Sequence, residues 1–185
     1  MDCSLDFLSR LQWRLRNYFC DDPILKDYVD DPYFWFGQKI RAKICLSVGK
    51  SFGLEEDLLL DIAAFTDLLH NASLIHDDLI DDDIERRGCE TPWKKYGKNK
   101  ALLLGDLLIA KSLTVSSSIK TSPSIKAAWA LEISNCITCA VRGAFNELDF
   151  ESNSFDDIIA NYTDMSRDKT GVMFALPARC VAIAS

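Results

Sequence analysis

Residues 54–78, LEEDLLLDIAAFTDLLHNASLIHDD, are the stretch that decides the fold. Its apolar side chains recur at steps of three and four residues, the spacing that places side chains on one face of an α-helix. The residues at these steps are Leu58, Ile62, Phe65, Leu69 and Ala72. The stretch therefore predicts a long helix with one face in the core.

The rest of the chain also has helical character. We predict helices over residues 30–53, ending near Gly49 or Gly53, and over 99–118, 124–150 and 154–185, the last with Ser154 as its N-cap. The 185 residues include only eight Gly and five Pro, and no Asn-Gly or Asp-Gly turn separates alternating runs, so no hairpin is predicted. The predicted fold is all-α, with long helices around one core in one domain, residues 1–185.

Composition and charge narrow the possible functions. A net charge of −7 argues against a general nucleic-acid binder but leaves open a phosphorylated small molecule. No apolar run approaches the roughly 20 residues that a membrane span needs. Seven scattered cysteines without a signal peptide favour reduced thiols and a cytoplasmic location. Cys136 and Cys139 form a CxxC without a second ligand pair, so we expect core thiols rather than a zinc site.

Carboxylates gather at the end of the first helix, in LIHDDLIDDDIERRG (74–88). Asp77 and Asp81 are four residues apart and share a helix face, with Asp78 beside them and His70 on the same face. Hard oxygen ligands at this spacing predict a site for Mg²⁺ or Ca²⁺, rather than zinc, formed by Asp77, Asp78 and Asp81. The alternative is a solvated acidic helix end.

Cationic residues follow the carboxylates directly. Arg86 and Arg87 carry planar forks that can grip phosphate through two nitrogens. Mg²⁺ commonly bridges a few carboxylates to substrate phosphates, so carboxylates next to arginines indicate a diphosphate site. Lys169 and Thr170, in RDKTG, could add a charge and a hydroxyl from another helix.

These motifs together resemble those of the trans-isoprenyl diphosphate synthases, the polyprenyl synthetase family. The resemblance rests on DDxxD followed after four residues by RRG, then on TPWKKYG, ALLLGDLLIAKS and RDKTG in order, and it covers about residues 36–185. It implies an isoprenoid-synthase-type bundle around a central apolar pocket, with Mg²⁺ as cofactor and usually a homodimer. Such enzymes join an allylic diphosphate to isopentenyl diphosphate and release a longer prenyl diphosphate.

The resemblance also implies residue roles. Asp77 and Asp81 would ligate Mg²⁺ on the allylic diphosphate, and Arg86 and Lys169 would contact that diphosphate as further catalytic groups. The other implied contacts are Thr170 and Asn146 for the allylic diphosphate, and Arg41, His70 and Arg87 for isopentenyl diphosphate. Gln38 stands where the family has a lysine for isopentenyl diphosphate, and Lys39, one residue later, is the candidate that compensates.

Small residues precede the aspartates on the first helix. Ala72 and Ser73 lie five and four residues before Asp77, where a bulky aromatic would close the product pocket early. Their small size predicts a product longer than the farnesyl chain, with Leu69 and Leu68, deeper in the pocket, as the candidates that end it. Ordinary helix packing would also explain their small size.

One family feature is absent from these 185 residues, a second aspartate-rich motif beyond RDKTG. We expect an incomplete domain, the N-terminal portion, either as a fragment, as a processed chain or as a degenerate paralogue. Such a domain would pair as a homodimer or with another synthase subunit. Two other functions stay open: a terpene cyclase-like enzyme that ionises an allylic diphosphate, and a non-catalytic regulatory subunit of a prenyl diphosphate synthase.

Overall fold

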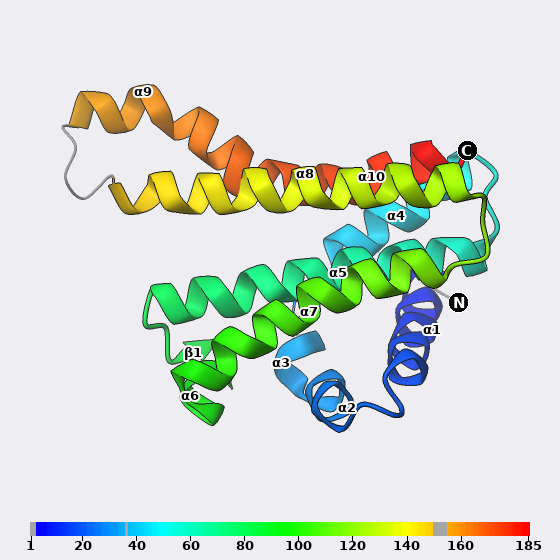
Figure 1. Cartoon of the computed structure of the whole chain (residues 1–185), viewed down its shortest axis with the longest axis horizontal. Helices are drawn as coiled ribbons and strands as arrows, with labels where there is room; N and C mark the ends of the chain where they lie inside the picture. The colour runs from blue at the N-terminus through cyan, green and yellow to red at the C-terminus, as the bar shows by residue number, and fades with distance from the viewer. Residues whose placement is uncertain (1–2, 36, 150–154) are drawn as a thin grey trace.

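The computed structural model describes residues 3–35, 37–149 and 155–185, and they form an all-α fold (Figure 1). The helices in these ranges are α1 (Cys3–Tyr18), α2 (Pro23–Asp30), α3 (Pro32–Trp35), α4 (Ile40–Ser51), α5 (Glu56–Ile80), α6 (Pro92–Tyr96), α7 (Lys98–Ser118), α8 (Pro123–Leu148), α9 (Phe155–Ser166) and α10 (Val172–Ala184). A π-helical turn, η2 (Arg167–Gly171), joins α9 to α10. The all-α prediction is confirmed.

The central element is α5, which packs beside α7 and against α4, α1 and α10. Four of the residues that predicted its buried face lie in the core: Ile62, Phe65, Leu69 and Ala72. Because neighbours surround α5, it is apolar on more than one face. By length and composition both α5 and α7 could cross a membrane, yet 72% of the apolar window of α5 is buried inside the protein, against 39% for α7. Core packing thus accounts for the apolar character of α5.

The helix predicted over residues 30–53 is interrupted, so that prediction is wrong in its first part. Helix α3 ends at Trp35 and α4 begins at Ile40. Between them Gly37 has φ +108° and Lys39 has φ +47°, which a helix does not allow. A Cβ on Gly37 would lie 1.8 Å from Nη1 of Arg87. The break thus brings the backbone against the end of the Arg87 side chain, and the φ of +108° favours glycine at this position.

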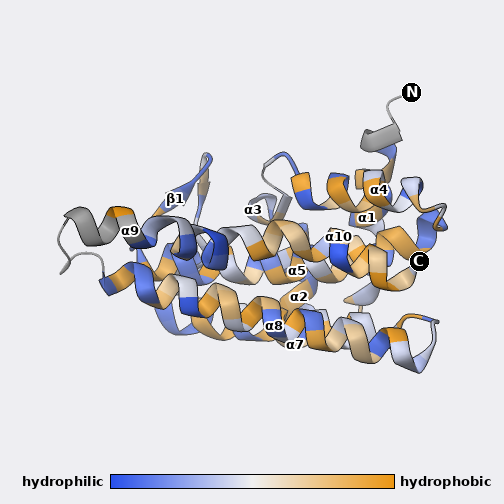
Figure 2. Cartoon of the chain, turned by 90° about the horizontal axis from the view of Figure 1, so that it is seen from above, coloured by the Kyte–Doolittle hydropathy of each residue, from blue (hydrophilic) through white to orange (hydrophobic). Residues whose placement is uncertain are grey.

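A short hairpin was not predicted. Strands β1 (Glu85–Arg86) and β2 (Cys89–Glu90) pair antiparallel, Glu85 with Glu90 and Arg86 with Cys89. The two turn residues, Arg87 at φ +54° and Gly88 at φ +85°, suit a tight hairpin that needs positive φ at both positions. The usual Asn-Gly or Asp-Gly signal is replaced by Arg-Gly. This hydrophilic hairpin projects beyond the helices in Figure 2.

The segment predicted as one helix over 154–185 is α9, η2 and α10, and Ser154 lies outside the described residues. Helix α10 packs on α8, α4 and α5, and Trp129 Nε1 of α8 donates to the Cys180 carbonyl at 2.9 Å. One face of α10 is thus buried, through Met173, Leu176, Pro177, Cys180 and Val181. Cys136 is buried and Cys139 half-buried on α8, and both are free thiols, as predicted.

Candidate active site

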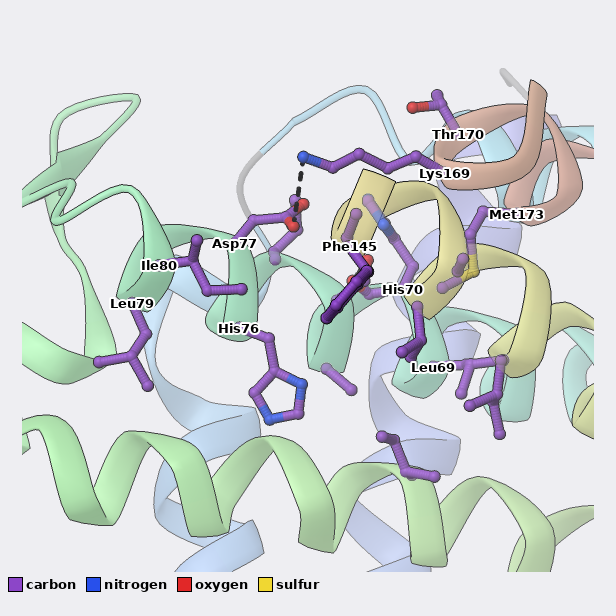
Figure 3. A pocket seen from close by; sticks show the side chains of 18 of the residues that line it. Leu69, His70, His76, Asp77, Leu79, Ile80, Phe145, Lys169, Thr170 and Met173 are labelled. Carbon is purple, nitrogen blue, oxygen red and sulfur yellow. Dashed lines mark hydrogen bonds and ion pairs between the residues drawn. The ribbon is translucent and has the colours of Figure 1, made fainter. Parts of the chain in front are cut away.

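A cavity of about 440 Å³ lies between α5, α7 and α8, beneath η2 and the start of α10 (Figure 3). Most of its lining is aliphatic or aromatic. The polar residues that line it are Arg41, His70, Ser73, His76, Asp77, Lys169 and Thr170. A volume in the range of about 300–1,000 Å³ with few polar groups is typical of small-molecule sites.

Carboxylates surround one ammonium at one end of the cavity, and we call Asp77, Asp81, Glu147 and Lys169 the acidic region. Lys169 Nζ lies 3.5 Å from Asp77 Oδ1 (Figure 3) and hydrogen-bonds the Glu147 carboxylate. Burial, together with the nearby Asp81, raises the pKa of Asp77 despite the Lys169 charge. Partial burial alone would lower the pKa of Lys169, but Glu147 and Asp77 outweigh it and hold this pKa above its ordinary value.

The backbone around Lys169 explains how its side chain reaches Asp77. Lys169 belongs to the π-helical turn η2, and such turns are frequent at functional sites. Gly143 of α8 lies against this turn, since a Cβ there would be 2.3 Å from the Lys169 backbone nitrogen. The close approach of the two backbones sets the ammonium over the end of α5.

Asp78 points away from the acidic region and is fully buried. Its Oδ2 accepts from the Tyr33 hydroxyl at 2.5 Å, and its Oδ1 accepts from Arg86 Nε at 2.6 Å. Burial and this hydrogen bond raise the pKa of Tyr33. Both oxygens of Asp78 are therefore engaged and hold Arg86 and Tyr33, and its role as a metal ligand stays a prediction.

Cations surround His70, and we call Lys39, Arg41, Arg86, Arg87 and His70 the basic region. Burial lowers the pKa of His70 well below its ordinary value, and the charges of Arg41, Lys39, Arg87 and Arg86 lower it further. His70 is thus neutral at pH 7. Its buried Nδ1 atom has no hydrogen-bond partner among the described residues. A buried polar atom of this kind needs a partner, and a ligand oxygen would supply one.

Arg41 and Lys39, like Arg86, are held by protein groups. Arg41 Nε donates to the Met173 carbonyl at 3.2 Å, and the guanidinium lies 4.2 Å from the centre of the Phe174 ring. Lys39 Nζ contacts Asp67 Oδ2 and the Phe34 carbonyl, each at 2.7 Å. Because Lys39 is committed to these buried partners, its position argues against the predicted compensation for Gln38.

The predicted residues divide into two groups. Those that line the cavity are Arg41, Leu69, His70, Ala72, Ser73, Asp77, Lys169 and Thr170. Those outside its lining are Gln38, Lys39, Asp78, Asp81, Arg86, Arg87 and Asn146. Gln38, Asn146 and Asp81 are exposed, and Asp81 ends α5.

Sequence reasoning missed Glu147 and Tyr33, because each acts on a residue at least 22 positions away and no local pattern marks it. The position of His76 in the cavity lining could have been inferred from the glycine of ALLLGDLLIAKS. A Cβ on Gly105 would lie 2.2 Å from His76 Nε2, so this glycine makes room for the imidazole.

A metal-ion site made of protein ligands alone does not form in the described part of the chain. There, no three His, Cys, Asp or Glu side chains converge on one point. Asp77 and Asp81 are one helical turn apart and remain the pair that fits a hard cation, with substrate oxygens to complete its shell.

The chain belongs to the polyprenyl synthetase family, which matches residues 22–185. The match begins earlier than the residue 36 that the motifs indicated. A short chain isoprenyl diphosphate synthase of Methanocaldococcus jannaschii is 32% identical over 170 residues, which are 91% of this chain and 50% of that protein. The chain thus spans about half the length of the curated relatives it matches.

Solved structures agree with this assignment. The geranylgeranyl pyrophosphate synthetase of Pyrococcus horikoshii superposes with a TM-score of 0.83 at 26% identity, covering 98% of this chain and 58% of that one. The corresponding enzyme of Geoglobus acetivorans, at 22% identity, shows the same fold with a TM-score of 0.85, over 97% of this chain and 59% of that one.

Proposed function

We propose that this chain is the whole or a part of a prenyltransferase that joins an allylic diphosphate to isopentenyl diphosphate and releases a longer trans-prenyl diphosphate. One observation carries the proposal: Asp77 and Lys169 at one end, and Arg41 and His70 beside them, line the same apolar cavity of about 440 Å³. Membership of the polyprenyl synthetase family supports it.

The acidic region would hold the allylic diphosphate. Asp77 and Asp81 fit Mg²⁺, which would stabilise the negative charge that develops on the departing diphosphate. Lys169 is close enough to share that diphosphate, because its ammonium already lies 3.5 Å from Asp77. Arg86, fixed by Asp78, adds a guanidinium near the end of α5. Preorganised charges of this kind act most strongly where water is excluded.

The basic region would hold isopentenyl diphosphate. Arg41 and Arg87 supply forks for its phosphates, and His70, kept neutral by burial and by its cationic neighbours, can donate one hydrogen bond. The aliphatic lining lets the allylic cation form away from water until the second alkene attacks. Gln38 carries no charge and is exposed, and the Lys39 ammonium is paired with Asp67, so the lysine contact that the family resemblance implies for isopentenyl diphosphate is not replaced here.

The prenyl chain would lie along α5 against Leu69, Ala72 and Ser73, which line the cavity. Ser73→Phe fills the cavity near its mouth, so we expect products shorter by at least one five-carbon unit with little loss of stability. Chromatography of the dephosphorylated products checks this. Ser47→Phe, on the exposed side of α4, is the control and should leave the product unchanged.

One assay tests the proposal, with the purified chain, labelled isopentenyl diphosphate, an allylic diphosphate and Mg²⁺. A longer prenyl diphosphate supports the proposal. Diphosphate released with a hydrocarbon or alcohol indicates instead a cyclase-like enzyme, which the uncharged Gln38 permits but Arg41, His70 and Arg87 disfavour. Absence of turnover, with altered activity of an added synthase, indicates a regulatory subunit. Sedimentation in the same buffer tests the predicted pairing as a homodimer or with another subunit.

A further inference from the structure

Helix α10 carries a proline in its interior, Pro177. In an α-helix the amide of each residue donates to the carbonyl four positions earlier, and proline has no amide hydrogen to donate. The carbonyl at issue here belongs to Met173. Pro177 therefore leaves this oxygen without its ordinary helical donor.

The Met173 carbonyl is the one that accepts from Arg41 Nε, at 3.2 Å. Arg41 lies in the first turn of α4, and the same turn of α10 offers the Phe174 ring to its guanidinium at 4.2 Å. The hydrogen bond engages Nε and neither terminal nitrogen. The two nitrogens that grip a phosphate are thus left for a ligand in the cavity, which Arg41 lines.

The acceptor itself is held in place. Met173 is buried and lines the cavity, and its Sδ lies 3.5 Å from Cys136 Sγ of α8. The turn of α10 that receives Arg41 is therefore packed between α4 and α8. A guanidinium that is largely withdrawn from water needs such a partner, because a buried donor without one is costly.

We propose that Pro177 is a positioning residue for Arg41, through the Met173 carbonyl that it frees. The identity of the ligand rests on the proposed function: Arg41 would present its fork to isopentenyl diphosphate. Pro177→Ala restores an amide that competes with Arg41 for the same oxygen. A carbonyl has two lone pairs, so the competition weakens the Arg41 contact rather than abolishing it.

The first test needs no ligand. Exchange of the Arg41 Nε hydrogen with solvent is followed by NMR in the full chain, with the resonance assigned by its loss in Arg41→Lys. We expect exchange at least about three-fold faster in Pro177→Ala, because the hydrogen bond that protects it is weakened. Pro123→Ala is the matched control, since Pro123 occupies the first turn of α8 and frees no carbonyl there. Equal exchange rates in wild type and Pro177→Ala would overturn the proposal.

The second test measures steady-state kinetics with isopentenyl diphosphate. We expect Pro177→Ala to raise KM about five-fold with kcat changed less than two-fold, and not to lower the unfolding temperature, since alanine favours the helix. Adding Pro177→Ala to Arg41→Lys should give no further increase in KM, because both act on one contact. Fully additive effects would show that Pro177 does not act through Arg41. If the wild-type chain shows no turnover, it is not an active prenyltransferase by itself, and the exchange measurement still decides the role of Pro177.

Discussion

The acidic and basic regions both place charge beside one cavity, yet they are built in opposite ways. In the acidic region Lys169 and Asp77 are partly open to water, with side chains 20% and 25% exposed. In the basic region Lys39 and Asp67 are closed off, with side chains 8% and 1% exposed. A partly exposed pair contributes little and exchanges partners easily, whereas a buried pair is costly to break.

This difference suggests a division of labour. Under the proposed function, the acidic region would release Lys169 from Asp77 when a metal ion and a diphosphate arrive, because the metal cation would replace the ammonium charge. In the basic region Lys39, Arg41 and Arg86 are held by protein groups near a neutral His70, so an anion would meet donors that are already oriented. One region is suited to exchange and the other to preorganised binding.

The largest expected effect is on the acidic region. Asp77→Ala removes a carboxylate that lines the cavity and should lower Mg²⁺-dependent turnover by about 10³-fold, because metal stabilisation of the leaving diphosphate supplies several kcal/mol. Turnover at increasing Mg²⁺ measures this. Glu85→Ala, an exposed carboxylate on β1, is the control with wild-type turnover expected. Wild-type turnover in Asp77→Ala would remove the metal site from this end of α5.

The second largest effect is expected when the buried ion pair of Lys39 is removed from the basic region. Lys39→Met leaves Asp67 buried without a counter-charge and should lower the free energy of unfolding by about 3–5 kcal/mol, whereas Lys39→Met with Asp67→Leu should recover most of it. Urea unfolding gives both values. Lys98→Met removes the exposed pair with Asp82 and should change stability by less than about 1 kcal/mol. If the double variant is stable but loses affinity for isopentenyl diphosphate, Lys39 is a substrate residue after all.

Asp78 holds Arg86, and replacing it should lower the free energy of unfolding by less than replacing Lys39 does. Asp78→Asn keeps the shape but removes the charge that holds Arg86, so we expect a loss of about 2 kcal/mol in unfolding free energy. Tyr33→Phe removes only the hydroxyl contact to Asp78 and should lose about 1 kcal/mol. Metal affinity separates the two roles of this residue. If the Asp78→Asn variant binds Mg²⁺ with the same affinity as wild type, Asp78 lies outside the metal site.

The smallest effect concerns pH. Because the pKa of His70 is lowered from 6.5 in the folded protein, the unfolded chain binds more protons below that value, and stability falls as pH falls below about 6.5. The pKa of Asp77 is raised above its ordinary value of 3.8, so the folded protein binds more protons there and the stability contributed by Asp77 falls as pH rises above that value. We expect His70→Asn to flatten the wild-type decline by up to about 1.4 kcal/mol per pH unit. Identical slopes for both proteins between pH 5 and about 6.5 would contradict a neutral His70.

Local patterns predicted the long elements well. The steps of three and four residues located α5, and α7 and α8 lie where their apolar runs indicated. Helices α1, α2 and α6 were not predicted as separate elements. Three further features were not predicted: the break at Gly37, the Arg-Gly hairpin and the π-helical turn at Lys169. Each depends on a neighbour distant in sequence, such as Arg87 against Gly37 or Lys169 against Gly143.

The sequence by itself determined the helical class, the family motifs and the position of Asp77 at the end of a buried helix, because these follow from spacing along one element. Only the tertiary structure decided how neighbouring residues divide their work. It turned Asp78 inward to hold Arg86, bound Lys39 to Asp67, and brought Lys169 over Asp77. The reason is physical: burial and charge pairing depend on which helices meet, and that depends on the packing of the whole chain.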